Sequence, residues 1–180
     1  MLIEIKRQSG KRSETNNEEL ALLYWATVVF KAGSIDKRPH ATHVLIDDNR
    51  AVCTDGNRMH VVELNREYKP GLYRVFKRAK THMILFLTDI DPAVKYPQYK
   101  SMFEVIERKD SKSIPVLNFI DPIESSGAYA RIIRETKVVA FNFGFLSDLN
   151  GIFDGYFDGP EKLAAFVDCK KTAFIMPLIG

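Results

Sequence analysis

Apolar and polar residues alternate in two different ways along this chain. Between residues 18 and 32 the apolar positions recur at helical spacing, and Gly33 follows as a C-terminal cap. Elsewhere, short apolar runs alternate with polar residues between turns, as is typical of antiparallel strands. In the first half the pattern predicts a strand at 2–7, the helix at 18–32, a turn at 47–50, and strands at 43–46, 51–54, 59–64, 71–76 and 83–87.

The second half varies this order. Strands are predicted at 102–107, 114–119, 137–141, 163–167 and 173–178, with turns at 154–155 and 158–160. Asn142 is a suitable cap for a second helix at 143–153. Each half is thus predicted to contain one helix followed by strands. This repeated order favours one internally duplicated α+β domain over residues 1–180, with approximate halves 1–94 and 95–180. No sequence repeat proves the duplication.

Composition indicates an ordinary globular protein. The chain is 46% hydrophobic and has 12 Phe and 7 Tyr, which suits a packed core and argues against disorder. Cys53 and Cys169 lie in apolar runs, which predicts buried free thiols in a reducing compartment. We find no signal peptide in residues 1–6 and no run long enough to span a membrane, and therefore expect a cytoplasmic protein with no membrane partner.

The charge is mild but unevenly placed. The formal net charge is +3. Residues 1–80 carry 15 Lys and Arg against 10 Asp and Glu, whereas residues 81–180 carry 11 against 13. A basic half can attract phosphate, although the same distribution of charged residues is also expected for an ordinary solvated surface.

The residues that could carry catalysis form no recognised constellation. His40 and His43 have the H-x-x-H spacing but no third ligand beside them, so a loop histidine and a strand histidine explain them better than a zinc site. The acidic turns at 47–48 and 89–92 lack the spaced ligands and glycine of a calcium loop. The sequence contains no G-x-S-x-G, no phosphate-binding glycine loop and no C-x-x-C. We expect no catalytic residue, no metal and no cofactor.

Four separated stretches carry the most specific signal. They are Cys53-Thr54-Asp55-Gly56-Asn57-Arg58-Met59-His60, Lys95-Tyr96-Pro97-Gln98-Tyr99-Lys100, Phe141-Asn142-Phe143-Gly144-Phe145-Leu146-Ser147-Asp148-Leu149 and the closing Phe174-Ile175-Met176-Pro177-Leu178. Each resembles a landmark of the bacterial sliding DNA clamp, the β subunit of DNA polymerase III. The family shows a T-D-G-x-R hairpin, an F/Y-P-x-Y stretch, an F-N-x-x-x-L-x-D-x-L helix start and an end in M-P plus an apolar residue. Asn57 stands where the family commonly has His, and the length suits one domain where the family usually has three.

The resemblance implies a DNA-clamp-like α+β fold, with two helices packed on one face of antiparallel sheet. It also implies a non-enzymatic processivity or scaffold factor with an apolar cleft. In the family this cleft takes short linear motifs of DNA polymerase and other clamp-binding proteins. Small residues would admit the peptide, and apolar walls would desolvate it. Carried over residue by residue, the site comprises Thr54, Gly56, Asn57, Met59, Pro97, Tyr99, Met102, Met176, Pro177 and Leu178.

Contact with double-stranded DNA is the weaker part of the resemblance. Clamp helices hold phosphates with Lys and Arg without reading sequence. Here the candidates lie mostly on loops: Lys6, Arg7, Lys11, Arg12, Lys31, Lys37 and Arg38. So short a chain would need to form a homo-oligomer to close a ring. The alternative is a clamp-fold adaptor that binds proteins and does not encircle DNA, and a more distant one is an enzyme on an unrelated α+β fold.

Overall fold

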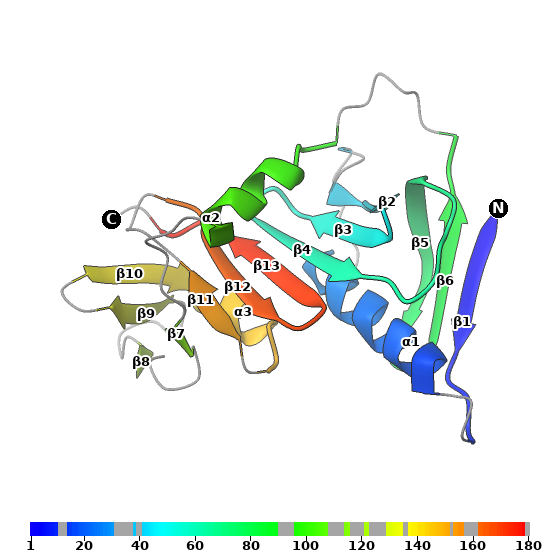
Figure 1. Ribbon diagram of the computed structural model, residues 1–180, viewed down its shortest axis with the longest axis horizontal. Helices are drawn as coiled ribbons and strands as arrows, with labels where there is room; N and C mark the ends of the chain where they lie inside the picture. Colours follow the sequence, from blue (N-terminus) through cyan, green and yellow to red (C-terminus); the bar gives the residue numbers. More distant parts are fainter. Residues whose placement is uncertain are drawn as a thin grey trace. The chain divides into compact units, whose positions relative to one another are not determined.

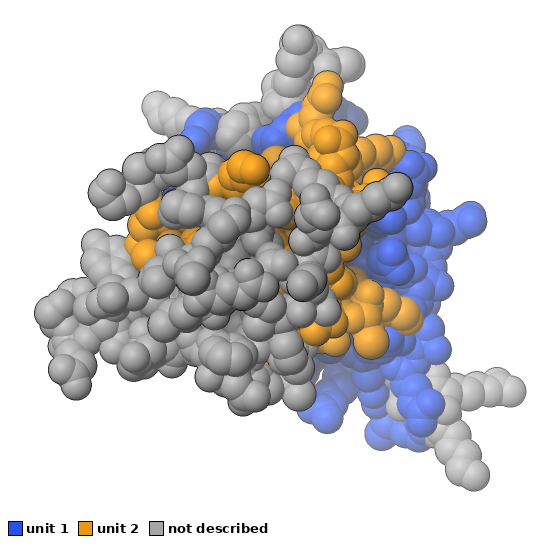
Figure 2. Space-filling view, turned by 60° about the vertical axis from the view of Figure 1, so that its left-hand side comes forward, with its two compact units in different colours: residues 1–97 blue, residues 98–180 orange. Residues whose placement is uncertain are grey.

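The computed structural model describes most of the chain in two compact units. The described residues are 1–10, 14–30, 38, 41–89, 96–107, 114–115, 121–122, 129–134, 137–151, 153–156 and 162–178. Unit 1 comprises Met1–Pro97 and unit 2 comprises Gln98–Gly180 (Figure 2). Each unit contains antiparallel strands and short helices (Figure 1).

Unit 1 is an antiparallel sheet with one main helix against it. Its elements are β1 (Leu2–Lys6), α1 (Glu14–Ala26), the 3-10 turn η1 (Thr27–Val29), β2 (His43–Asp47), β3 (Arg50–Thr54), β4 (Arg58–Glu63), β5 (Gly71–Ala79) and β6 (His82–Leu87). The strands lie in the order β1-β6-β5-β2-β3-β4. Every strand predicted in this half is confirmed, with ends that differ by a few residues.

The helix α1 begins four residues before the predicted start. Its N-terminal turn is fixed by side chains, because Asn16 Nδ2 donates to the Lys6 carbonyl at 2.6 Å. The predicted apolar face is confirmed: Leu20 and Leu23 are buried, and α1 contacts β1, β3, β4 and β6 (Figure 1). The α-helix ends at Ala26 and η1 follows, where the Thr27 hydroxyl donates to the Leu23 carbonyl at 2.8 Å. The prediction that the helix continues to residue 32 is wrong, because Phe30 already has an extended backbone with a ψ of 112°; residues 31–33 lie outside the described residues.

The β2–β3 hairpin shows why the predicted turn at 47–50 is correct. Asp47 pairs with Arg50, so that Asp48 and Asn49 alone form the connection. Both adopt left-handed backbone angles, with φ of 46° and 56°. Tight hairpins need such angles, and Asp and Asn tolerate them better than other residues with side chains.

Unit 2 contains two antiparallel sheets. The first has the order β13-β12-β11-β7 and the second β10-β9-β8. Phe141 of β10 and Phe166 of β12 join the two sheets through an edge-to-face contact, with ring centroids 5.5 Å apart. The elements are η3 (Lys100–Phe103), α2 (Glu104–Glu107), β7 (Ile114–Pro115), β8 (Asp121–Pro122), β9 (Tyr129–Arg134), β10 (Lys137–Asn142), α3 (Phe143–Ser147), β11 (Asp154–Tyr156), β12 (Ala164–Asp168) and β13 (Lys171–Ile175).

Four predictions for unit 2 are corrected. The expected strand at 102–107 is helical, because its apolar residues also fit a helix turn at spacings of three and four. The helix expected at 143–153 ends at Ser147, although Asn142 caps it as predicted and accepts from the Gly144 amide at 2.9 Å. The expected turn at 154–155 is strand β11, and the strand expected at 173–178 ends at Ile175. The turn expected at 158–160 and most of the strand at 114–119 lie outside the described residues.

The cysteines behave differently from each other. Cys53 is a buried free thiol, as predicted, whereas Cys169 is exposed. Cys169 occupies the tight β12–β13 turn with a φ of 41°, which explains its position at the surface despite its apolar neighbours in sequence. In the described part of the chain, no helix is long and apolar enough to cross a membrane.

Candidate functional site

The T-D-G-x-R sequence forms a rigid turn between β3 and β4. The Asp55 carboxylate accepts hydrogen bonds from the amides of Asn57 and Arg58 at 3.0 and 3.1 Å, and it pairs with Arg58 Nε at 3.2 Å. The Thr54 hydroxyl donates to the Arg58 carbonyl at 2.7 Å and accepts from the Gly56 amide at 3.1 Å. Gly56 has a φ of +92°, which a residue with a side chain rarely adopts. Each residue of the motif therefore has a structural role.

This turn exposes its tip and buries the residues that flank it. Thr54 and Met59 lie directly opposite each other on β3 and β4 and are both buried, whereas Gly56 and Asn57 are exposed. The Arg38 guanidinium lies over Gly56, and a Cβ atom added to Gly56 would be 3.4 Å from Arg38 Nη1. Sequence reasoning considered Arg38 only as a phosphate contact and missed this neighbour.

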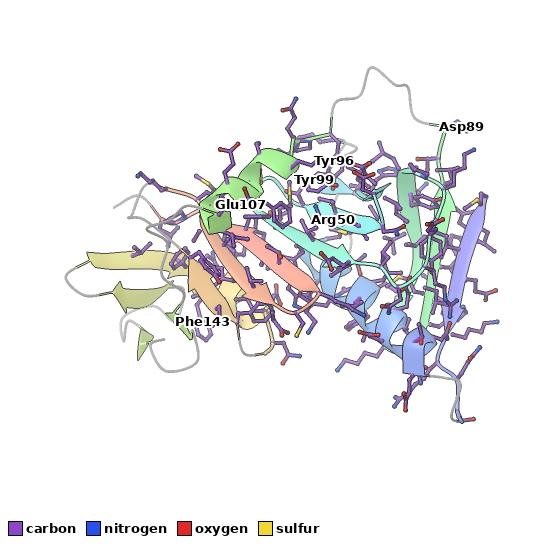
Figure 3. The ribbon with its side chains drawn as sticks, in the orientation of Figure 1. Arg50, Asp89, Tyr96, Tyr99, Glu107 and Phe143 are labelled. Atoms are coloured by element: carbon purple, nitrogen blue, oxygen red, sulfur yellow. The ribbon has the colours of Figure 1, made fainter. Side chains whose placement is uncertain are left out.

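The hairpin also binds the segment that carries Pro97. Tyr96, which is labelled in Figure 3, donates a hydrogen bond from its hydroxyl to the Val52 carbonyl of β3 at 2.9 Å. Burial raises the pKa of Tyr96 well above its usual value, so it remains a neutral donor. Half-buried Pro97 is thus held near the strand that leads into Thr54. Tyr96 belongs to the F/Y-P-x-Y stretch, but its anchoring role could not be derived from the sequence alone.

In unit 2, aromatic rings fix the segment that carries Tyr99 and Met102. Tyr99 is buried, and its ring lies 6.5 Å from that of Phe103. Phe103 in turn packs edge-to-face on Phe174 of β13, with centroids 5.2 Å apart. Met102 is half-buried, and its amide donates to the Tyr99 carbonyl at 3.0 Å.

The M-P-x segment follows directly after β13. Met176 is 45% exposed, Pro177 is buried and Leu178 is half-buried. The Leu178 amide donates to the Ala140 carbonyl of β10 at 2.8 Å, which fixes the path of this segment. Exposed Met176 is therefore presented on an ordered backbone.

The ten predicted cleft residues fall into two sets of five. Unit 1 positions Thr54, Gly56, Asn57, Met59 and Pro97, and unit 2 positions Tyr99, Met102, Met176, Pro177 and Leu178.

Three of the seven predicted phosphate contacts, Lys6, Arg7 and Arg38, belong to the described residues. Lys11, Arg12, Lys31 and Lys37 lie outside the described residues. Lys6 and Arg7 are exposed, but Lys6 lies on the face of β1 opposite the buried Ile3 and Ile5, and so points away from α1. The sequence of α1 has no Lys or Arg, and Glu14 and Glu18 are exposed on it.

A buried Cys–His pair in unit 1 was not noticed in the sequence. Cys53 and His60 lie directly opposite each other on β3 and β4, and both side chains are fully buried. Burial raises the pKa of the Cys53 thiol and lowers that of His60 to about 3, so both are neutral at pH 7. A neutral thiol is a poor nucleophile, so this pair lacks the activation that covalent catalysis needs. Among the described residues, no three His, Cys, Asp or Glu side chains form a group that could hold a metal ion.

Replacement of Asp55 tests the rigidity of the turn. We expect Asp55→Ala to lower the free energy of unfolding by about 1–3 kcal/mol, because two amides and the largely buried Arg58 guanidinium lose their acceptor. Urea unfolding at pH 7 measures this change. The control Glu67→Ala removes an exposed carboxylate and should change stability by less than about 0.5 kcal/mol. Equal stabilities for the two variants would show that the turn does not depend on Asp55.

Comparison with known proteins shows the fold. No family model and no curated protein sequence matches the chain. Among solved structures, it is similar to a putative DNA polymerase III β subunit from Eubacterium rectale (TM-score 0.56, 13% identity, covering 100% of this chain and 66% of that one). It is also similar to the Pseudomonas aeruginosa sliding clamp (0.59, 10%, 100% and 67%) and to the Helicobacter pylori β clamp bound to a DNA ligase peptide (0.58, 15%, 99% and 65%).

These similarities confirm the predicted fold class. The chain spans about two thirds of the length of these structures. At 10–15% identity, the similarity shows the fold. The protein therefore has the α+β fold of the bacterial sliding DNA clamps.

Proposed function

We propose that this protein is a non-enzymatic, sliding-clamp-like factor that tethers a DNA polymerase or another partner enzyme to DNA. Partners bind through a short linear peptide in an apolar cleft. The observation that carries the proposal is that the T-D-G-x-R turn and the M-P-x segment both have a fixed backbone. Four hydrogen bonds fix the turn at Gly56, and Met176 is exposed on the fixed segment that follows β13. The clamp fold supports it.

The proposed cleft combines the two sets of five residues. Its support is the fold, together with the anchoring of Tyr96 on β3 in unit 1 and of Tyr99 against Phe103 in unit 2. Gly56 has no side chain, so a ligand side chain that enters beside it has to displace only the Arg38 guanidinium. Met102, Met176 and Leu178 offer apolar surface. Methionine adapts its shape, which suits a site that serves several partners. The Helicobacter pylori clamp binds a DNA ligase peptide, and we propose the same class of ligand here.

Shortening Met176 tests the cleft. We expect Met176→Ala to weaken the binding of a fluorescent DNA ligase peptide about ten- to a hundredfold, since the loss of one apolar anchor contact typically costs about 1–3 kcal/mol. Met176 is 45% exposed, so the variant should fold normally. Phe76→Ser is the matched control, because Phe76 is exposed on another surface and should not affect this binding. The proposal would be contradicted if the wild-type protein did not bind the peptide, or if Met176→Ala bound it with unchanged affinity.

A second candidate is a clamp-fold adaptor that binds proteins without encircling DNA. The charge of α1 favours it, because this helix contains three Glu and neither Lys nor Arg. A clamp-like ring, by contrast, needs cations that hold phosphate and several copies of the chain.

DNA binding separates the two candidates. For the tethering function we expect non-specific binding to circular duplex DNA that weakens steeply with salt, because released counterions drive it. Replacing Lys6, Arg7, Lys11 and Arg12 together with Ala should remove most of it. The measurement is affinity across a salt series, with the mass in solution recorded with and without DNA. No binding even at low salt would leave the adaptor as the function.

A further inference from the structure

One face of unit 1 exposes large apolar side chains that the proposed cleft does not use. Leu2 is 48% exposed, Phe76 is 73% exposed and Phe86 is 42% exposed. These three residues define the outer patch. They lie on β1, β5 and β6, which are neighbours in the sheet (Figure 1).

The strand register places the three side chains together. Leu2 lies directly opposite Phe86, and Phe86 lies directly opposite Arg74. Residues opposite each other in antiparallel strands share one face of the sheet. Phe76 contacts Phe86 edge-to-face, with ring centroids 5.4 Å apart, so it belongs to the same face. Ile3 and Ile5 alternate with Leu2 and are buried, so the outer patch faces away from the core.

A β-bulge produces the exposure of Phe76. The pairing of β5 with β6 shifts between Val75 and Lys77 and leaves Phe76 without an opposite residue. Lys77 then lies opposite Ile84, on the same face as Phe86. The bulge therefore directs two consecutive side chains, Phe76 and Lys77, to the outer face. Bulges commonly re-aim side chains at functional surfaces.

The outer patch is large enough to bind a partner. If a large apolar side chain offers about 150–250 Å², the three exposed fractions leave on the order of 300 Å² of apolar surface open to water. The largest patch on a monomeric protein is of this size and is often functional.

The charges around the outer patch indicate the chemistry of the partner. Strands β1, β5 and β6 contain one carboxylate, Glu4. Lys6 on the same face neutralises it, because Lys6 Nζ lies 2.9 Å from Glu4 Oε1, and His82 Nε2 lies within hydrogen-bond distance of the same oxygen at 2.9 Å. Arg74 and Lys77 lie beside the apolar residues and are exposed. The face is therefore apolar at its centre and cationic at its rim.

From this arrangement we infer that the outer patch docks an acidic, extended protein segment whose apolar side chains cover Leu2, Phe76 and Phe86 and whose carboxylates meet Arg74 and Lys77. A second copy of the chain fits less well, because a symmetric contact would bring the same cations together. The edge strand β1 favours a polypeptide over a lipid surface. In the described part of unit 1, β1 is paired on one side only, by β6, and a polypeptide can use the open side for main-chain hydrogen bonds.

A synthetic peptide in which Glu and Leu alternate is a suitable probe. We expect the protein to bind it at low salt and to lose affinity as salt rises. Phe76→Ser and Lys77→Glu should each weaken binding about tenfold or more. Lys80→Glu changes an exposed lysine in the β5–β6 turn and is the matched charge control. Met176→Ala should have no effect, which keeps this test independent of the cleft.

Three results would overturn the inference. The first is equal binding of a Lys-Leu peptide, which would show unspecific apolar contact. The second is binding to phosphatidylglycerol vesicles without binding to the acidic peptide, which would make the outer patch a membrane surface. The third is a dimer in solution that Phe76→Ser dissociates, which would make a second copy its occupant. Thermal unfolding of each variant confirms that loss of binding is not loss of fold.

Discussion

Acid is expected to destabilise unit 1 strongly, because His60 is buried in its neutral form. Its side chain is fully buried and stacks on Trp25, with ring centroids 4.1 Å apart. Nδ1 lies 3.3 Å from the Trp25 carbonyl, while Nε2 has no hydrogen-bond partner among the described residues. Burial is the main reason that the pKa of His60 falls from 6.5 to about 3, and the nearby Arg58 charge lowers it further.

The direction of the pH effect follows from this shift. The unfolded chain binds a proton at His60 near pH 6.5, whereas the folded chain binds it only near pH 3. The contribution of His60 to stability is therefore complete above about pH 6.5 and is lost as the pH falls toward 3. Each pH unit in this window costs about 1.4 kcal/mol, so we expect a loss of about 2–3 kcal/mol at pH 4.5.

Urea unfolding followed by the fluorescence of Trp25, the single tryptophan, measures this effect. In His60→Phe, a ring that cannot be protonated replaces the imidazole that stacks on Trp25. The free energy of unfolding should then decrease much less as the pH falls. His82→Gln removes a histidine from the sheet surface and should retain the steep fall. Wild-type stability that stays level between pH 7 and pH 4.5 would contradict the assignment.

A large loss of stability is also expected for Phe174→Ala in unit 2. Phe174 is 1% exposed and supports Phe103, which in turn packs against Tyr99. Removing a buried phenyl ring leaves a cavity and typically costs about 3–5 kcal/mol. Urea unfolding followed by circular dichroism should show this loss, whereas Phe143→Ala should cost less, because Phe143 is 36% exposed and Phe174 is 1% exposed. Similar stabilities for the two variants would show that Phe174 does not support this segment.

Local signals in the sequence predicted local structure well. The β2–β3 turn was predictable because Asp48 and Asn49 favour its backbone angles, and the cap of α3 was predictable because Asn142 suits that position. The errors arose where two structures satisfy the same pattern. The apolar spacing between Met102 and Glu107 fits either a strand or a helix. The structure is helical there, and in it Phe103 packs on Phe174.

The candidate site was predictable only in part. The motifs identified the residues of the turn, since Thr54, Asp55 and Arg58 act on close neighbours in sequence. The roles of Tyr96 and Phe103 depend on contacts with residues 44 or more positions away, Val52 and Phe174. No local pattern encodes such contacts. The position of Arg38 over Gly56 was missed for the same reason.

The central claim is that the proposed cleft residues bind a DNA ligase peptide, and the methionines among them allow a direct test. The chain has five methionines, of which Met59, Met102 and Met176 belong to the proposed cleft. Met1 is 59% exposed and Met83 is fully buried, and neither belongs to it. The measurement is a titration of methyl-labelled protein with the DNA ligase peptide, followed by NMR. We expect the methyl signals of Met59, Met102 and Met176 to shift together with one dissociation constant while those of Met1 and Met83 stay unchanged. Shifts confined to one unit, or none at saturating peptide, would contradict the account.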